Sequence, residues 1–147
     1  MTKIAYRRIA VDNIEIFYRE AGRPTAPALL LLHGFPTASH MFRDLIPLLA
    51  DRFRLIAPDL PGFGRSDMPD RGTFTYTFDN VARVIDRFTE VIGLDRFAIY
   101  VFDCCPGGEF PVGAKFESAM PLQRPASKVY DVGVDDIRLL QRRRKRK

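Results

Sequence analysis

Residues 26–69 read APALLLLHGFPTASHMFRDLIPLLADRFRLIAPDLPGFGRSDMP and carry the strongest fold signals in the chain. Residues 28–32 and 53–57 are short, mostly apolar runs, each soon followed by glycine or proline. Such a run is typical of a strand buried on both faces of a sheet. The alternation of strand, loop, helix, strand and loop predicts the β-α-β unit of a parallel sheet.

The segment between the two runs, residues 39–49, carries apolar residues every three or four positions. This spacing predicts a helix with one apolar face. Pro47 lies inside the segment, and proline removes a backbone donor and clashes with the preceding turn. We therefore expect the helix to kink or break at Pro47.

Outside this stretch, the pattern predicts an N-terminal hairpin, a second amphipathic helix and a third buried strand, at residues 6–11 with 14–18, 78–92 and 97–102. Asp12 and Asn13 give the hairpin its turn. Asp79 is the expected N-cap of the helix and Gly93 its C-terminal stop. The fold class predicted is α/β.

Both loops of the opening stretch, residues 33–36 and 59–64, directly follow a predicted strand. Ligands bind outside the carboxyl ends of the strands in an open parallel sheet. Asp103 follows the third buried strand. We therefore expect the functional site at this edge of the sheet.

The HGFP turn at residues 33–36, followed at this separation by DLPGFGRSDMP at residues 59–69, resembles the N-terminal half of an α/β-hydrolase. The Phe35-Pro36 version of the first loop resembles the epoxide hydrolase and dehalogenase branch, whose nucleophile is an aspartate. The resemblance covers about residues 4–103. It implies a truncated α/β-hydrolase core with a mostly parallel sheet and an N-terminal hairpin, followed by an irregular C-terminal tail.

The resemblance implies catalytic roles for the residue after the third strand and for two backbone N–H groups. In the family the nucleophile occupies a tight turn between strand and helix, flanked by small residues. Asp103 falls at that position, although Cys105 stands where glycine is usual and Pro106 follows. The N–H groups of Phe35 and Cys104 are the implied donors of the oxyanion hole, which stabilises developing negative charge.

The remaining residues of the first loop, His33, Gly34 and Pro36, are expected to shape that loop and the pocket. In the family a histidine at the position of His33 holds the loop by hydrogen bonds. The Phe35 side chain either lines the pocket or fills the core. Asp59 is expected to accept hydrogen bonds from backbone N–H groups of its own turn. We expect no cofactor, and no spacing of ligands indicates a metal site.

An aspartyl ester intermediate needs a general base that activates water. In the family this base is a histidine after the nucleophile, but His33 and His40 both precede Asp103. The expectation is therefore a hydrolase that is truncated or frameshifted and catalytically impaired. We divide the chain into residues 1–103, the N-terminal part of an α/β-hydrolase domain, and residues 104–147, a divergent and poorly ordered tail.

The net charge of +5 comes from a basic run at residues 142–147. This run supports an alternative, a non-catalytic fragment whose tail binds nucleic acid or anionic surfaces nonspecifically. No apolar stretch reaches the roughly 18 residues of a membrane span, and two adjacent cysteines make no disulfide framework. We expect a cytoplasmic protein with a small-molecule substrate if it is active, and leave the oligomeric state open.

Overall fold

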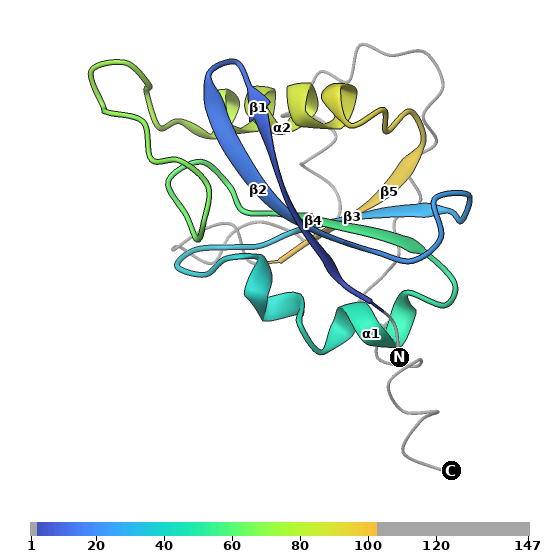
Figure 1. Cartoon of the computed structure of the whole chain (residues 1–147). Helices are drawn as coiled ribbons and strands as arrows, with labels where there is room; N and C mark the ends of the chain where they lie inside the picture. The colour runs from blue at the N-terminus through green and yellow to red at the C-terminus, as the bar shows by residue number, and fades with distance from the viewer. Residues whose placement is uncertain (1–2, 103–147) are drawn as a thin grey trace.

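The computed structural model of the chain describes residues 3–102. Five strands form one sheet in the order β1-β2-β4-β3-β5 (Figure 1). The strands are β1 (Ala5–Val11), β2 (Ile14–Ala21), β3 (Ala28–Leu32), β4 (Arg54–Pro58) and β5 (Phe97–Val101). β2 pairs antiparallel with both β1 and β4, whereas β4, β3 and β5 run parallel. The predicted α/β class, with a mostly parallel sheet and an N-terminal hairpin, is confirmed.

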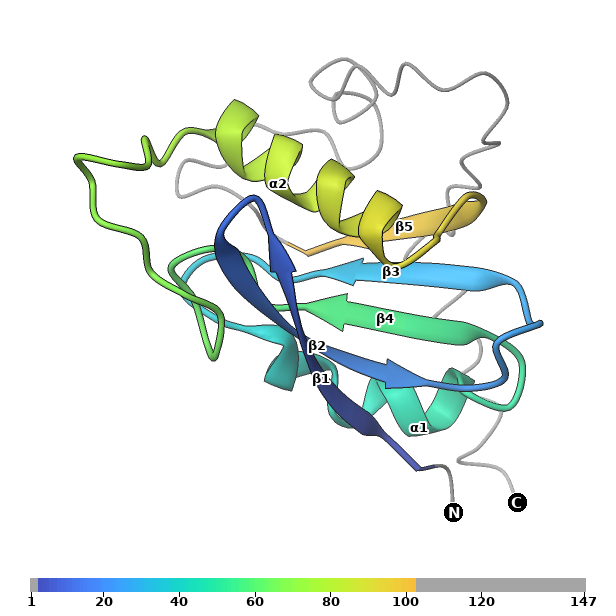
Figure 2. The ribbon, with the colours of Figure 1, turned by 45° about the horizontal axis from the view of Figure 1, so that its top comes forward.

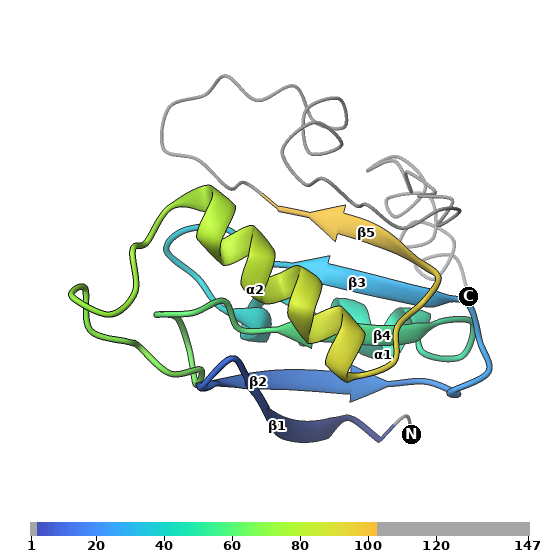
Figure 3. The ribbon, with the colours of Figure 1, turned by 90° about the horizontal axis from the view of Figure 1, so that it is seen from above.

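Helices cover both faces of the parallel strands. They are the short 3₁₀ helix η1 (Ser39–Phe42), α1 (Leu45–Leu49) and α2 (Phe78–Val91). The long helix α2 lies across one face, while η1 and α1 lie on the other (Figures 2 and 3). None of the helices in residues 3–102 is long and apolar enough to cross a membrane.

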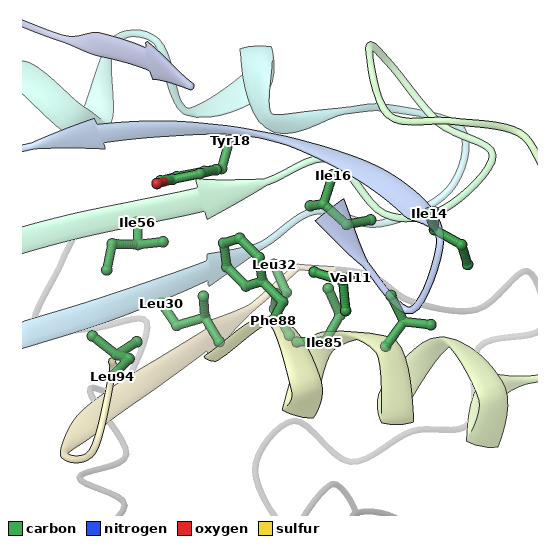
Figure 4. Close-up of a cluster of buried hydrophobic side chains, with 11 residues drawn as sticks. Val11, Ile14, Ile16, Tyr18, Leu30, Leu32, Ile56, Ile85, Phe88 and Leu94 are labelled. Carbon is green, nitrogen blue, oxygen red and sulfur yellow. The ribbon is translucent and has the colours of Figure 1, made fainter. Parts of the chain in front are cut away.

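The unbroken apolar sequence of β3 follows from this two-sided cover, because successive side chains point to opposite faces. Leu30 and Leu32 pack in the cluster under α2, and Leu29 and Leu31 in the cluster beneath η1 and α1. Phe88 of α2 is fully buried at the centre of the first cluster, where its ring packs edge-on against another aromatic ring (Figure 4).

The helical segment between β3 and β4 breaks earlier than predicted. η1 ends at Phe42 and α1 begins at Leu45, so the break falls at residues 43–44. Pro47 is the third residue of α1. The N–H groups of a first helical turn have no intrahelical acceptor, so proline is tolerated there. The predicted break at Pro47 is therefore wrong.

The hairpin turn forms as expected, with Asp12 and Asn13 both at positive φ, 46° and 65°. Two such residues give the twist that joins adjacent antiparallel strands in a two-residue turn. Asp12 and Asn13 tolerate this conformation better than most residues.

The predictions for the two ends of α2 have different outcomes. The N-cap is Thr77, whose hydroxyl accepts the Asn80 N–H, and Asp79 instead lies in the first helical turn. The predicted N-cap at Asp79 is wrong by two positions, because both residue types can cap. Gly93 ends the helix at a φ of 68°, as expected. Its N–H and that of Leu94 close the last turn on helical carbonyls, which is a Schellman motif.

Candidate functional site

The carboxyl ends of β3, β4 and β5 meet at one edge of the sheet, where the two loops of the opening stretch begin. β3 is followed by residues 33–36 and β4 by residues 59–64. Beyond the end of β5, the Phe102 N–H donates a hydrogen bond to the Leu32 carbonyl, with an N···O distance of 3.0 Å. The end of β5 therefore lies directly beside the first loop.

His33 joins the two loops, and its side chain is fully buried. The Leu60 N–H donates to Nε2 over 3.0 Å, so Nε2 carries no proton. Nδ1 then carries the ring proton and donates to the Gly34 carbonyl at 3.1 Å. Both nitrogens of His33 are therefore engaged in backbone hydrogen bonds.

The electrostatic surroundings of His33 favour this neutral ring. Burial is the largest influence on the pKa of His33 and lowers it from its ordinary value near 6.5. The Gly34 hydrogen bond and the nearby Asp59 carboxylate oppose the shift and are the smaller influences. A neutral ring is required because a protonated Nε2 could not accept the Leu60 N–H.

Asp59 connects the second loop to the start of η1, and only 2% of its surface is exposed. Oδ2 accepts the Arg65 N–H of its own loop at 2.8 Å, the type of bond that the sequence predicts. Oδ1 accepts the Ser39 N–H at 2.7 Å, which links it to the segment after the first loop. A Cβ at Gly64 would lie 2.1 Å from Oδ2, so only glycine leaves room for the carboxylate.

The second loop is also fastened to strand β2. The Ser66 hydroxyl donates to the Asp59 carbonyl at 2.7 Å and accepts the Phe17 N–H at 2.9 Å. Asp67 receives the Glu15 N–H on its carboxylate at 2.8 Å. The sequence pattern did not reveal the two bonds to β2, since their partners are 49 and 52 positions apart.

The first loop presents Phe35 to solvent, with 60% of its surface exposed. Its ring packs edge-on against Phe63 with centroids 6.1 Å apart, and the Phe35–Pro36 peptide bond is cis. Within residues 3–102 the Phe35 N–H has no acceptor. Of the residues on either side of Phe35, Gly34 is buried and Pro36 is exposed.

The structure thus brings His33, Gly34, Phe35 and Pro36 to the expected edge of the sheet. Asp103 and Cys104 lie outside the described residues, so their predicted roles remain predictions. In the part of the chain that the structure describes, no three His, Cys, Asp or Glu side chains are grouped to hold a metal ion.

Comparison with known proteins places this geometry in a family. The model of the alpha/beta hydrolase fold family matches residues 27–104, just over half of the chain. An uncharacterised hydrolase of Saccharomyces cerevisiae, YNR064C, is 41% identical over 126 residues, covering 85% of this chain and 43% of the relative. An alignment of that length includes residues after Asp103.

Dehalogenases are also similar to the chain. Haloalkane dehalogenase 2 of Mycobacterium tuberculosis H37Rv is 49% identical over 82 residues, covering 56% of this chain and 27% of the relative. The crystal structure of haloalkane dehalogenase DbeA from Bradyrhizobium elkani USDA94 matches with a TM-score of 0.64 and 36% identity. That match covers 67% of this chain and 33% of the solved one.

The chain spans less than half the length of each of these three proteins. Within that span, the sheet order, the two loops and the sequence matches agree with one another. The chain belongs to the alpha/beta hydrolase fold family.

Proposed function

We propose that this chain forms part of a hydrolase with an aspartate nucleophile, resembling haloalkane dehalogenases and epoxide hydrolases. The observation that carries the proposal is the hydrogen bond from Phe102 N–H to the Leu32 carbonyl. Asp103 is joined to Phe102 by one peptide bond, which keeps consecutive Cα atoms about 3.8 Å apart. Phe102, the residue directly before the proposed nucleophile, therefore lies beside the start of the first loop.

The proposed chemistry begins with attack of the Asp103 carboxylate on an electrophilic carbon of a small-molecule substrate. A C–O bond forms as the carbon–halogen bond breaks and the halide leaves with the bonding electrons, or as the C–O bond of an epoxide breaks and its oxygen takes a proton from water. The product is an ester on the enzyme. Backbone N–H groups of Phe35 and Cys104 would stabilise the charge when water later attacks this ester.

Hydrolysis of the ester requires a base, and the 147 residues hold no histidine after Asp103. We therefore propose that this stretch by itself is alkylated once and turns over poorly. The division at residue 103 likewise stays a proposal. The alternative of nucleic-acid binding through the basic run receives no support from the relatives named above, which are hydrolases and dehalogenases by name.

The test is intact-mass spectrometry of the full chain after incubation with a haloalkane or an epoxide. We expect one adduct per chain, lost in Asp103→Asn and kept in Asp51→Asn, because Asp51 is exposed in the turn between α1 and β4. Hydroxylamine should release the adduct, because it cleaves an ester but not a thioether on Cys104 or Cys105.

Three results would overturn parts of the proposal. Absence of any hydroxylamine-sensitive adduct would reject Asp103 as the nucleophile, as would turnover that survives Asp103→Asn. Sustained turnover that depends on Asp103 would show that no later histidine is needed.

A further inference from the structure

One face of the β1–β2 hairpin carries alternating rings and guanidinium groups. The register pairs Tyr6 with Arg19 and Arg8 with Phe17, so these four side chains stand on the same face. The Tyr6 and Phe17 rings are stacked with centroids 6.2 Å apart. Arg65, from the loop after β4, adds a third cation 5.3 Å from the Phe17 ring. We name these five residues the arginine–aromatic face.

The cations are held in place by the rings. The Arg19 guanidinium carbon lies 5.1 Å from the Tyr6 centroid and 5.8 Å from that of Phe17, and the Arg8 carbon lies 6.0 Å from Phe17. Such cation–π contacts are attractive, and a guanidinium in ring contact keeps its planar set of N–H donors. The donors of the face are therefore partly preorganised.

Two of the three cations have no carboxylate partner among residues 3–102. Arg8 is paired with Glu15, but within residues 3–102 neither Arg19 nor Arg65 is paired with an acid. Arg19 donates its Nε–H to the Ser39 hydroxyl at 3.1 Å, which leaves its terminal amino groups. The face thus offers two guanidinium groups to an external anion.

We propose that the arginine–aromatic face binds an acidic peptide segment of a partner protein, whose carboxylates bind Arg19 and Arg65. Arginine forms paired N–H···O bonds with carboxylates, and an opposite charge favours encounter. Tyr6 is 57% exposed and supplies the rigid aromatic contact that is common at protein interfaces. A peptide fits better than a lipid surface, because the face has no protruding apolar helix of the kind that inserts into lipid.

The location of this face connects it to the loops of the functional site. Arg65 donates its backbone N–H to Asp59, and Ser39, the partner of the Arg19 side chain, donates its own N–H to the same carboxylate. A bound peptide would therefore stabilise the loop after β4 and its connection to η1. The proposal does not depend on the chemistry of Asp103.

The test measures binding of a fluorescent oligoglutamate peptide to the full chain by anisotropy at low salt. The paired variants are Arg19→Gln with Arg65→Gln, and the matched control Arg83→Gln with Arg96→Gln, which removes the same charge from exposed sites away from the face. Both proteins keep the basic run at residues 142–147, so its contribution is equal. We expect binding to fall about tenfold or more only in the first pair, since tenfold corresponds to about 1.4 kcal/mol.

Arg65→Gln alone is a second variant that should not disturb folding, because its side chain is exposed. It should also weaken binding, and added salt should weaken binding to the unmodified chain. Equal loss in both variant pairs would mean that net charge alone attracts the peptide, and would overturn the proposal. So would absence of binding, as expected if the arginines only keep the edge strand from pairing with other chains, or binding to anionic vesicles but not to the peptide.

Discussion

At the scale of single residues, His33 and Asp59 decide how the two loops approach each other. Both are buried, and each binds backbone N–H or carbonyl groups from more than one segment. A buried polar group that is fully hydrogen-bonded stabilises one arrangement, whereas loss of one partner leaves the other unsatisfied. Substitution of either side chain should therefore destabilise the site, whether or not the side chain has a catalytic role.

Replacing the imidazole tests this role directly. His33→Leu removes the acceptor of the Leu60 N–H, and we expect the free energy of unfolding to fall by about 1–3 kcal/mol. Urea denaturation measures the change. His40→Leu is the matched control, because His40 is exposed and its loss should change stability by less than about 0.5 kcal/mol. Equal effects in the two variants would contradict the role assigned to His33.

The lowered pKa of His33 predicts a pH dependence with a definite sign. The unfolded histidine takes up a proton below its ordinary pKa near 6.5, while the buried ring stays neutral. The unfolded state then binds more protons, so stability is complete above that pKa and falls as the pH drops towards the lower, folded pKa. Denaturation at a series of pH values in this range measures how the free energy of unfolding changes with pH. It should fall with pH in the unmodified chain and in His40→Gln, and fall less steeply in His33→Gln.

At the scale of elements, the loop after β4 is built around the Asp59 carboxylate and the helix α2 ends on Gly93. Gly64 and Gly93 both have positive φ, 56° and 68°. Their surroundings differ, because a Cβ at Gly93 would meet no atom within 4 Å, whereas one at Gly64 would overlap Asp59 and approach Ala38. Comparing substitutions at the two glycines therefore separates the cost of backbone strain from the cost of steric overlap.

Gly93→Ala should lower the free energy of unfolding by about 1–2 kcal/mol, the cost of a left-handed conformation for a residue with a side chain. Gly64→Ala should cost a further 1–3 kcal/mol or so, as overpacking does. Thermal or urea unfolding of the two variants gives the comparison. A Gly64→Ala variant as stable as Gly93→Ala would show that the loop can move away from Asp59 at little cost.

At the scale of the whole molecule, the sheet is held between two apolar clusters, one under α2 (Figure 4) and one beneath η1 and α1. The cluster under α2 joins side chains of β1, β2, β3 and β4 to the helix. Packing on this face therefore fixes the hairpin relative to the parallel strands. Stability should depend most on the largest side chain at its centre.

Phe88→Ala should lower the free energy of unfolding by about 3–5 kcal/mol, because it removes a fully buried ring and leaves a cavity. Val91→Ala on the same helix is the control. Val91 is 44% exposed, so its change should be within about 0.5 kcal/mol. Chemical denaturation of both variants checks this, and similar losses would mean that α2 contributes no specific core at Phe88.

The sequence alone was enough for the parallel strands, the hairpin turn and the stop of α2. These features depend on local rules, namely the short apolar runs, the turn at Asp12 and Asn13, and the left-handed glycine at Gly93. It also located the first loop at the correct edge of the sheet, because a parallel strand must end there.

The connection between the loops and the position of the break in the first helical segment depend on packing between distant parts of the chain. The bonds of His33 to Leu60 and of Asp59 to Ser39 join residues 27 and 20 positions apart. Such pairs depend on how separate loops pack, and no local pattern encodes their approach. Pro47 likewise was compatible with two helical arrangements, and packing of α1 against the sheet selected the one in which proline occupies the first turn.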